Sequence, residues 1–82
     1  MEFEIGNMIV VNEESRRYFL SGDELTIYVI SELHKDPKIA YAYPLGEIPN
    51  SETLVFSSIY RMATDSEVKT YQLKNLFKAR GN

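Results

Sequence analysis

Large and small apolar side chains alternate without interruption in the segment IAYAYPL, which spans residues 39–45. A period of two is the spacing of a β-strand, because successive side chains of a strand point to opposite faces of the sheet. Tyr41 and Tyr43 therefore share one face of the predicted strand, and the two alanines form the other, which predicts close packing against another layer. Pro44 fits a strand end or a sheet edge, because it has no N–H to donate to a neighbouring strand.

Two further segments are predicted strands. Residues 9–11 form the β-branched run Ile-Val-Val, and Gly6 before it predicts a bulge or turn that redirects the chain. Residues 53–62, TLVFSSIYRM, are interpreted as one more strand. A chain of 82 residues without cysteine has too little length for two cores and no disulfide to replace a core. The sequence therefore predicts a single domain over residues 1–82.

The segment ELTIYVISEL at residues 24–33 fits two secondary structures. As a strand, it has five β-forming residues at its centre, and the odd-numbered residues from Leu25 to Val29 face inward. As a helix, it begins with a capping box of Ser21 and Glu24 and ends before Pro37. We adopt the strand, because the propensity of the central residues favours it.

Polar and turn-forming residues predict loops or turns over residues 12–17, 21–23, 34–37, 46–51 and 63–66. Residues 18–20 are expected to form a short strand or part of a loop. The last segment has Asp65 or Ser66 as a candidate N-cap and Gly81 as a C-terminal stop, which predicts a helix most clearly over residues 74–80. The alternative for its first part is a last strand over residues 68–73.

Together these elements predict a mainly β, small α+β fold, in which an antiparallel sheet of about five strands is followed by a short C-terminal helix. The opening MEFEIGNMIVVNEE also resembles the first strand of small Src-homology-3-like or KOW-type β-barrels, through the step from Phe3 to Val10. In this resemblance GDELTIYVISEL and KIAYAYPLG supply the second and third strands, and Leu76 closes the barrel. The resemblance implies a small barrel that acts as a binding module, with its contact surface on the loops of one rim.

Nothing in the sequence points to a catalytic or metal centre. His34 is the single histidine and lies beside a predicted turn, and one imidazole without a thiolate does not make a zinc site. The acidic pairs Glu13-Glu14 and Asp23-Glu24 are adjacent, so their carboxylates diverge on a strand. No phosphate-binding glycine loop and no nucleophile elbow occurs. We expect neither enzymatic activity nor a cofactor nor a bound metal.

Charge is divided unevenly along the chain. Residues 1–67 carry a net charge of −7, residues 68–82 carry +4, and the whole chain carries −3. Cations that a basic patch would use are Arg16, Arg17, Lys69, Lys74, Lys78 and Arg80. Such a patch would meet phosphates or an acidic partner, whereas the simpler interpretation is a solvated helix end.

Aromatic residues supply a second candidate surface. The chain has six tyrosines, four phenylalanines and no tryptophan. If the strand with Tyr41 and Tyr43 pairs with the strand that follows, then Tyr60 and Arg61 join them in one tyrosine and arginine surface. The alternative is that these rings fill the core or cover its edge.

The sequence therefore predicts a small non-enzymatic interaction or regulatory module that binds another protein of unknown identity. The alternative function is nucleic-acid binding through the basic C-terminal segment and the surface tyrosines. A homo-oligomer is a third expectation, because an open sheet leaves unpaired edges. No apolar run approaches the ~20 residues of a membrane helix, and no secretory signal is visible, so we expect a soluble cytoplasmic protein without a membrane partner.

Overall fold

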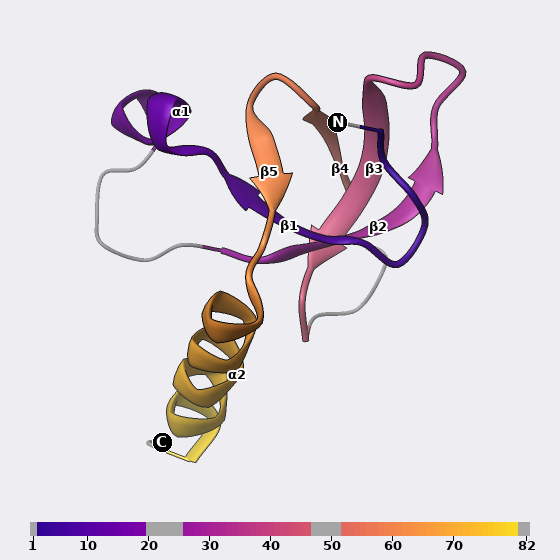
Figure 1. Ribbon diagram of the computed structural model, residues 1–82. Helices are drawn as coiled ribbons and strands as arrows, with labels where there is room; N and C mark the ends of the chain where they lie inside the picture. The colour runs from indigo at the N-terminus through magenta and orange to yellow at the C-terminus, as the bar shows by residue number, and fades with distance from the viewer. Residues whose placement is uncertain (1, 20–25, 47–51, 81–82) are drawn as a thin grey trace.

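A computed structural model describes residues 2–19, 26–46 and 52–80, with the side chains of all of these except 17–19 and 77–80. The elements in chain order are β1 (Met8–Val11), α1 (Glu13–Phe19), β2 (Tyr28–Leu33), β3 (Ile39–Pro44), β4 (Thr53–Phe56), β5 (Tyr60–Met62) and α2 (Asp65–Arg80). All five strands pair antiparallel in one open sheet, in the order β4-β3-β2-β1-β5 (Figure 1). The predicted mainly β class with a C-terminal helix is confirmed.

The sheet is strongly curled, because its two edge strands follow one another in the chain. Only residues 57–59 join β4 to β5, and such a link spans at most about 14 Å. The edges of a flat five-stranded sheet lie about 19 Å apart, at about 4.8 Å for each strand spacing. The sheet therefore bends until the end of β4 approaches the start of β5, as Figure 1 shows at the top of the molecule.

One face of the curled sheet, the inner face, forms the core. Its fully or almost fully buried cluster consists of Phe3, Ile9, Ile30, Ala40, Ala42 and Val55. Both alanines are 0% exposed, so the predicted close packing of this face of β3 is confirmed. Small side chains here let the opposite wall of the curl approach, and any larger group would have to displace it.

The predicted strand within residues 24–33 is confirmed for β2, but its predicted facing is wrong. Tyr28 and Ile30 point toward the core, while Val29 lies on the outer face. The register with β1 decides this, because Tyr28 lies opposite Ile9, which belongs to the core. Ile27 is buried as expected, whereas Leu25 lies outside the described residues.

The turn before β1 has the predicted glycine at its centre. Gly6 has φ of 93°, a conformation that costs an L side chain energy and glycine little. The Asn7 N–H donates to the Glu4 carbonyl (3.1 Å), and the Asn7 Oδ1 accepts from the Glu4 N–H (2.9 Å). The chain thereby reverses direction, so that Phe3 enters the core.

Residues 12–17 were expected to form a loop, and this prediction is wrong from residue 13 onward. They belong to α1, which also contains residues 18 and 19 in place of the expected strand or loop. Asn12 caps this helix, because its Oδ1 accepts from the Ser15 N–H at 2.9 Å. Glu13 and Glu14 then place negative charge at the positive end of the helix.

The hairpin between β2 and β3 has the predicted turn at residues 34–37. Asp36 organises it, because its Oδ1 accepts from the Lys38 N–H (2.9 Å) and its carbonyl accepts from the Ile39 N–H (3.0 Å). The expected turn at 21–23 lies outside the described residues. Of the expected loop at 46–51, only Gly46 is described, apart from its neighbours 47–51.

The segment 53–62 is not one strand. Residues 57–59 form a turn in which the Ile59 N–H donates to the Phe56 carbonyl (2.9 Å). This turn separates β4 from β5 and carries the chain from one edge of the sheet to the other. The paired serines at its start weaken the β preference of the run, and hydroxyl residues favour turns.

The C-terminal helix is confirmed and is longer than its clearest predicted part, so the alternative strand at 68–73 is wrong. The helix begins at Asp65, and its cap is Thr64 rather than Asp65 or Ser66. Thr64 Oγ1 accepts from the Glu67 N–H (3.1 Å), and a Glu67 carboxylate oxygen accepts from the Thr64 N–H (2.9 Å). This reciprocal pair is a capping box.

We expect Thr64→Ala to lower the free energy of unfolding by about 1 kcal/mol, because the first turn of α2 loses its side-chain cap. Urea denaturation followed by far-ultraviolet circular dichroism measures this loss. Thr70→Ala is the matched control, since Thr70 is exposed within the same helix. An equal loss in both variants would show that the box contributes nothing specific.

Candidate functional site

The outer face of β2, β3 and β4 is apolar and aromatic rather than polar. We call the set Val29, Tyr41, Tyr43, Leu54 and Phe56 the tyrosine face. Val29 lies opposite Tyr43, and Tyr41 lies opposite Leu54, so the register places these side chains on one side of the sheet. Leu54 is 47% exposed and Phe56 is 40% exposed. The second face of an antiparallel sheet ordinarily carries polar residues, so this surface departs from what solvation alone requires.

A β-bulge adjusts this face beside Tyr41. The pairing of β2 with β3 shifts by one residue between Ile30 and Glu32, which leaves Ser31 as the extra residue. Ser31 Oγ donates to the Tyr41 carbonyl at 3.2 Å, and this bond holds the bulge against β3. The His34 ring lies 6.2 Å from the Tyr41 ring, tilted by 44°, so the aromatic surface continues to the hairpin turn.

Tyr60 and Arg61 do not join Tyr41 and Tyr43, so the combined tyrosine and arginine surface does not form. They lie on β5, and two strands, β1 and β2, separate β5 from β3. Tyr60 instead packs against the core from the inner face and meets Tyr28 edge-on, with ring centroids 5.9 Å apart. Burial raises the pKa of the Tyr60 hydroxyl, and the nearby Tyr28 adds to this.

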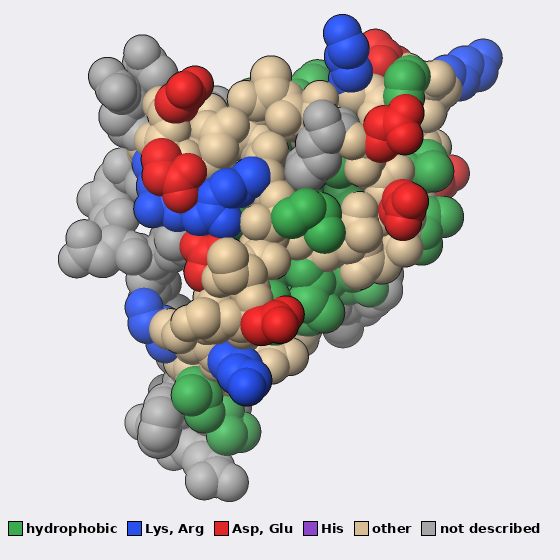
Figure 2. Space-filling model, in the orientation of Figure 1, with side chains coloured by type: hydrophobic (Ala, Val, Ile, Leu, Met, Phe, Trp, Pro, Cys, Tyr) green, Lys and Arg blue, Asp and Glu red, His purple; other side chains and the backbone are tan. Residues whose placement is uncertain are grey.

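Arg61 lies on the outer face of β5 and forms the centre of a charged cluster with Glu13, Glu67 and Arg16. Its Nη2 lies 2.8 Å from a carboxylate oxygen of Glu13 and 2.8 Å from one of Glu67, while Nη1 reaches the other Glu67 oxygen at 2.8 Å. Arg16 makes longer contacts, 3.4 Å to Glu13 and 3.8 Å to Glu67. Figure 2 shows the interleaved positive and negative side chains beside α1.

This cluster ties three elements together, because Glu13 begins α1, Arg61 belongs to β5 and Glu67 lies in the first turn of α2. Hydrogen bonds from the Arg61 guanidinium lower the pKa of Glu67 to about 2 and also lower the pKa of Glu13. The two carboxylates in turn raise the pKa of Arg61. Arg16 and Arg61 are therefore held by carboxylates of the same chain, which leaves them little capacity to bind an external anion.

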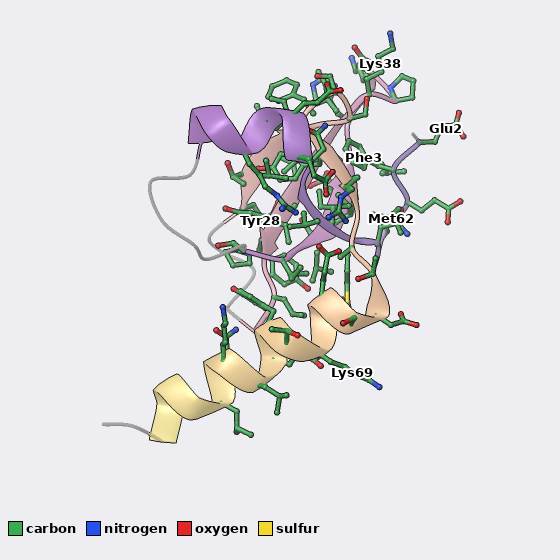
Figure 3. The ribbon with its side chains drawn as sticks, turned by 60° about the vertical axis from the view of Figure 1, so that its left-hand side comes forward. Glu2, Phe3, Tyr28, Lys38, Met62 and Lys69 are labelled. Atoms are coloured by element: carbon green, nitrogen blue, oxygen red, sulfur yellow. The ribbon has the colours of Figure 1, made fainter. Side chains whose placement is uncertain are left out.

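The predicted basic patch is only partly visible. Lys69 and Lys74 are exposed on α2, and Figure 3 shows Lys69 pointing away from the helix and from the sheet. Lys78 and Arg80 lie in the last turns of α2, and Arg17 lies in α1, but their side chains are outside the described set. The described lysines are not brought beside Arg16, which is bound within the charged cluster.

His34 contributes to the hairpin turn, since its Nδ1 accepts from the Asp36 N–H at 3.1 Å. The described residues contain no group of three histidine, cysteine, aspartate or glutamate side chains placed to bind a metal ion. Within the same ranges, neither helix combines the length and apolar composition that a bilayer crossing requires.

A scan against protein-family models and searches of curated proteins and solved structures find no match to this chain. The resemblance of the N-terminal half to Src-homology-3-like or KOW-type barrels stays a prediction.

Sequence reasoning identified Tyr41 and Tyr43 but missed Val29, Leu54 and Phe56 as their neighbours. The alternation of Leu54 and Phe56 was visible in the sequence, yet only the strand register shows that they share the face of the tyrosines. The acidic partners of Arg61 were also missed. For Glu67 there was a local signal, because Thr64-x-x-Glu67 has the spacing of a capping box.

Proposed function

We propose that this protein is a non-enzymatic module that binds another protein through the tyrosine face. One observation carries the proposal: the outer face of β2 to β4 holds two tyrosines among aliphatic and aromatic neighbours, while the inner face already forms the core. A fold of this size gains no core stability from exposed Leu54 and Phe56, so their presence is explained by a contact outside the chain.

The chemistry of this face defines the partner. Tyrosine side chains present a large apolar ring with a hydroxyl at its tip, and they lose few rotamers on binding. Glu32, which lies opposite Tyr41, is an acidic side chain at the border of the face. The matching partner surface is apolar at its centre, with a hydrogen-bond acceptor or donor for each tyrosine and a cation near Glu32.

We expect the double variant Tyr41→Thr/Tyr43→Thr to lose its partner while it keeps its fold, since threonine retains the β preference of both positions. Capture from a cell extract with the wild-type chain identifies the partner, and binding of that purified partner is then measured. A loss of about 2 kcal/mol, or roughly thirty-fold in Kd, is expected for two tyrosines at the centre of an interface.

Tyr71→Gln is the control, because it removes a tyrosine from α2 instead of β3. Circular dichroism establishes that the sheet is intact in each variant. A partner that binds the double variant as tightly as the wild type would contradict the proposal, and so would a wild-type capture with no protein above background.

The alternative is a nucleic-acid-binding function, which the exposure of Lys69 and Lys74 on α2 favours. It has less support, because Arg16 and Arg61 bind Glu13 and Glu67 within the chain. The capture experiment is therefore repeated with nuclease-treated extract. Loss of the partner on nuclease treatment, with binding that falls steeply with salt, would favour the nucleic-acid alternative.

A further inference from the structure

The free edge of β4 offers unsatisfied backbone groups to another strand. The Ser57 N–H donates to the Lys38 carbonyl at 2.9 Å, and Val55 lies opposite Ala40. Residues two apart on a strand direct their backbone groups to the same side, so Thr53 and Val55 also face β3. Leu54 and Phe56 direct theirs to the open edge, where among the described residues only the Phe56 carbonyl has a partner, the Ile59 N–H.

This edge lacks the devices that ordinarily block strand addition. No lysine, proline or bulge occurs between Thr53 and Phe56, and the two residues that face the edge have large apolar side chains that are 47% and 40% exposed. An exposed edge of this kind pairs readily with a second strand.

We propose that two copies of this chain associate through β4, antiparallel about a two-fold axis, into one continuous sheet. Parity of the edge-facing residues allows few registers. In the favoured register Leu54 of each copy lies opposite Phe56 of the other, and the two Val55 residues meet at the axis. Each Leu54 and Phe56 pair then exchanges both backbone hydrogen bonds and also packs side chain against side chain. The Phe56 carbonyl has a second lone pair for this bond.

Two features favour a second copy as the occupant. The neighbouring register, with Leu54 opposite Leu54, sets Glu52 against Phe56 and loses the apolar pairs, so the self-complementary arrangement is distinct. Charge is also self-complementary, because Glu52 precedes β4 and Lys38 lies beside its other end, where its carbonyl accepts from Ser57. A two-fold rotation brings Glu52 of each copy toward Lys38 of the other copy.

The proposal goes beyond the proposed function and stands without it. Pairing at β4 joins the two tyrosine faces into one surface, whereas Tyr41 and Tyr43 lie on β3 and make no edge contact. Loss of self-association on changing Leu54 or Phe56 and loss of partner binding on changing Tyr41 and Tyr43 are therefore separate results.

Sedimentation equilibrium of the full chain over micromolar to millimolar concentration tests the association. We expect a mass that rises to twice 9.5 kDa. Leu54→Pro removes an edge N–H without touching the ladder to β3, so it should keep the mass of a single chain at every concentration. Phe56→Lys should do the same and serves if the proline variant fails to fold. Leu76→Lys, which changes an exposed leucine of α2, should associate like the wild type.

The register is tested by cross-linking, since the chain has no cysteine of its own. Val55→Cys should form a disulfide-linked dimer under mild oxidation, because Cα atoms of such a directly opposed pair lie about 4.5 Å apart. Leu54→Cys should not, because its two copies lie about 7–8 Å apart on a diagonal. A wild-type chain of single mass at millimolar concentration, or association that persists in Leu54→Pro and Phe56→Lys, would overturn the proposal.

Discussion

Ile30→Ala is expected to lower the free energy of unfolding by about 3–4 kcal/mol, which is most of the stability of a domain this small. Ile30 is 1% exposed and lies in the core cluster on β2, which has a neighbouring strand on each side. Truncation removes buried methyl groups and leaves a cavity that the curled sheet closes only in part. Urea denaturation measures the change.

Ile5→Ala is the matched control, because the substitution is identical and Ile5 is 67% exposed in the turn before β1. We expect this variant to change stability by about 0.5 kcal/mol or less. If both variants lost the same amount, the location of the core on the inner face would be wrong.

Arg61→Met is expected to lower stability by about 2 kcal/mol at neutral pH, because it removes the charge-assisted hydrogen bonds that join Glu13 to Glu67. The estimate allows for solvent screening, since the Arg61 side chain is 30% exposed. Methionine keeps the apolar stem over β1 and β5, so the loss reports the guanidinium. Arg16→Met is the matched control and should cost about 0.5 kcal/mol or less, because the contacts of Arg16 are longer.

The effect of Arg61→Met depends on pH with a defined sign. The pKa of Glu67 is about 2 in the folded chain against 4.5 in the unfolded chain, so its ionised form contributes stability above about pH 4.5. That contribution is lost as the pH falls toward 2, where the difference between wild type and variant should disappear. In the variant, the pKa of Glu67 should return toward 4.5, which carboxylate titration by NMR measures. A difference in stability that stays constant from pH 7 to 2 would contradict this role of the ion pairs.

Local sequence signals predicted the strands well where residue type and spacing agreed. The alternation in β3 identified both its extent and its buried alanines, and the β-branched run identified β1. Errors occurred where a local signal was read with the wrong partner. The polar run after Asn12 is a capped helix, and the serines at 57 and 58 interrupt what was taken for a single strand.

The candidate site was predictable only in part for the same reason. Tyr41 and Tyr43 share a face by the geometry of a single strand, so the sequence was sufficient to place them together. Their neighbours Leu54 and Val29 come from two other strands, and no local pattern specifies which strands adjoin β3. Arg61 was assigned to the same surface because the order of the strands was unknown.

By itself, the sequence determined the type of most elements, because strand and cap preferences arise from backbone sterics and from hydrogen bonds between residues a few positions apart. Only the tertiary structure decided which face of β2 is buried, that β5 joins β1, and that Arg61 meets Glu13 from 48 positions away in the chain. These features depend on the register of strands distant in sequence. A shift of one residue reverses every side chain, and the free energy that selects the register comes from the assembled core.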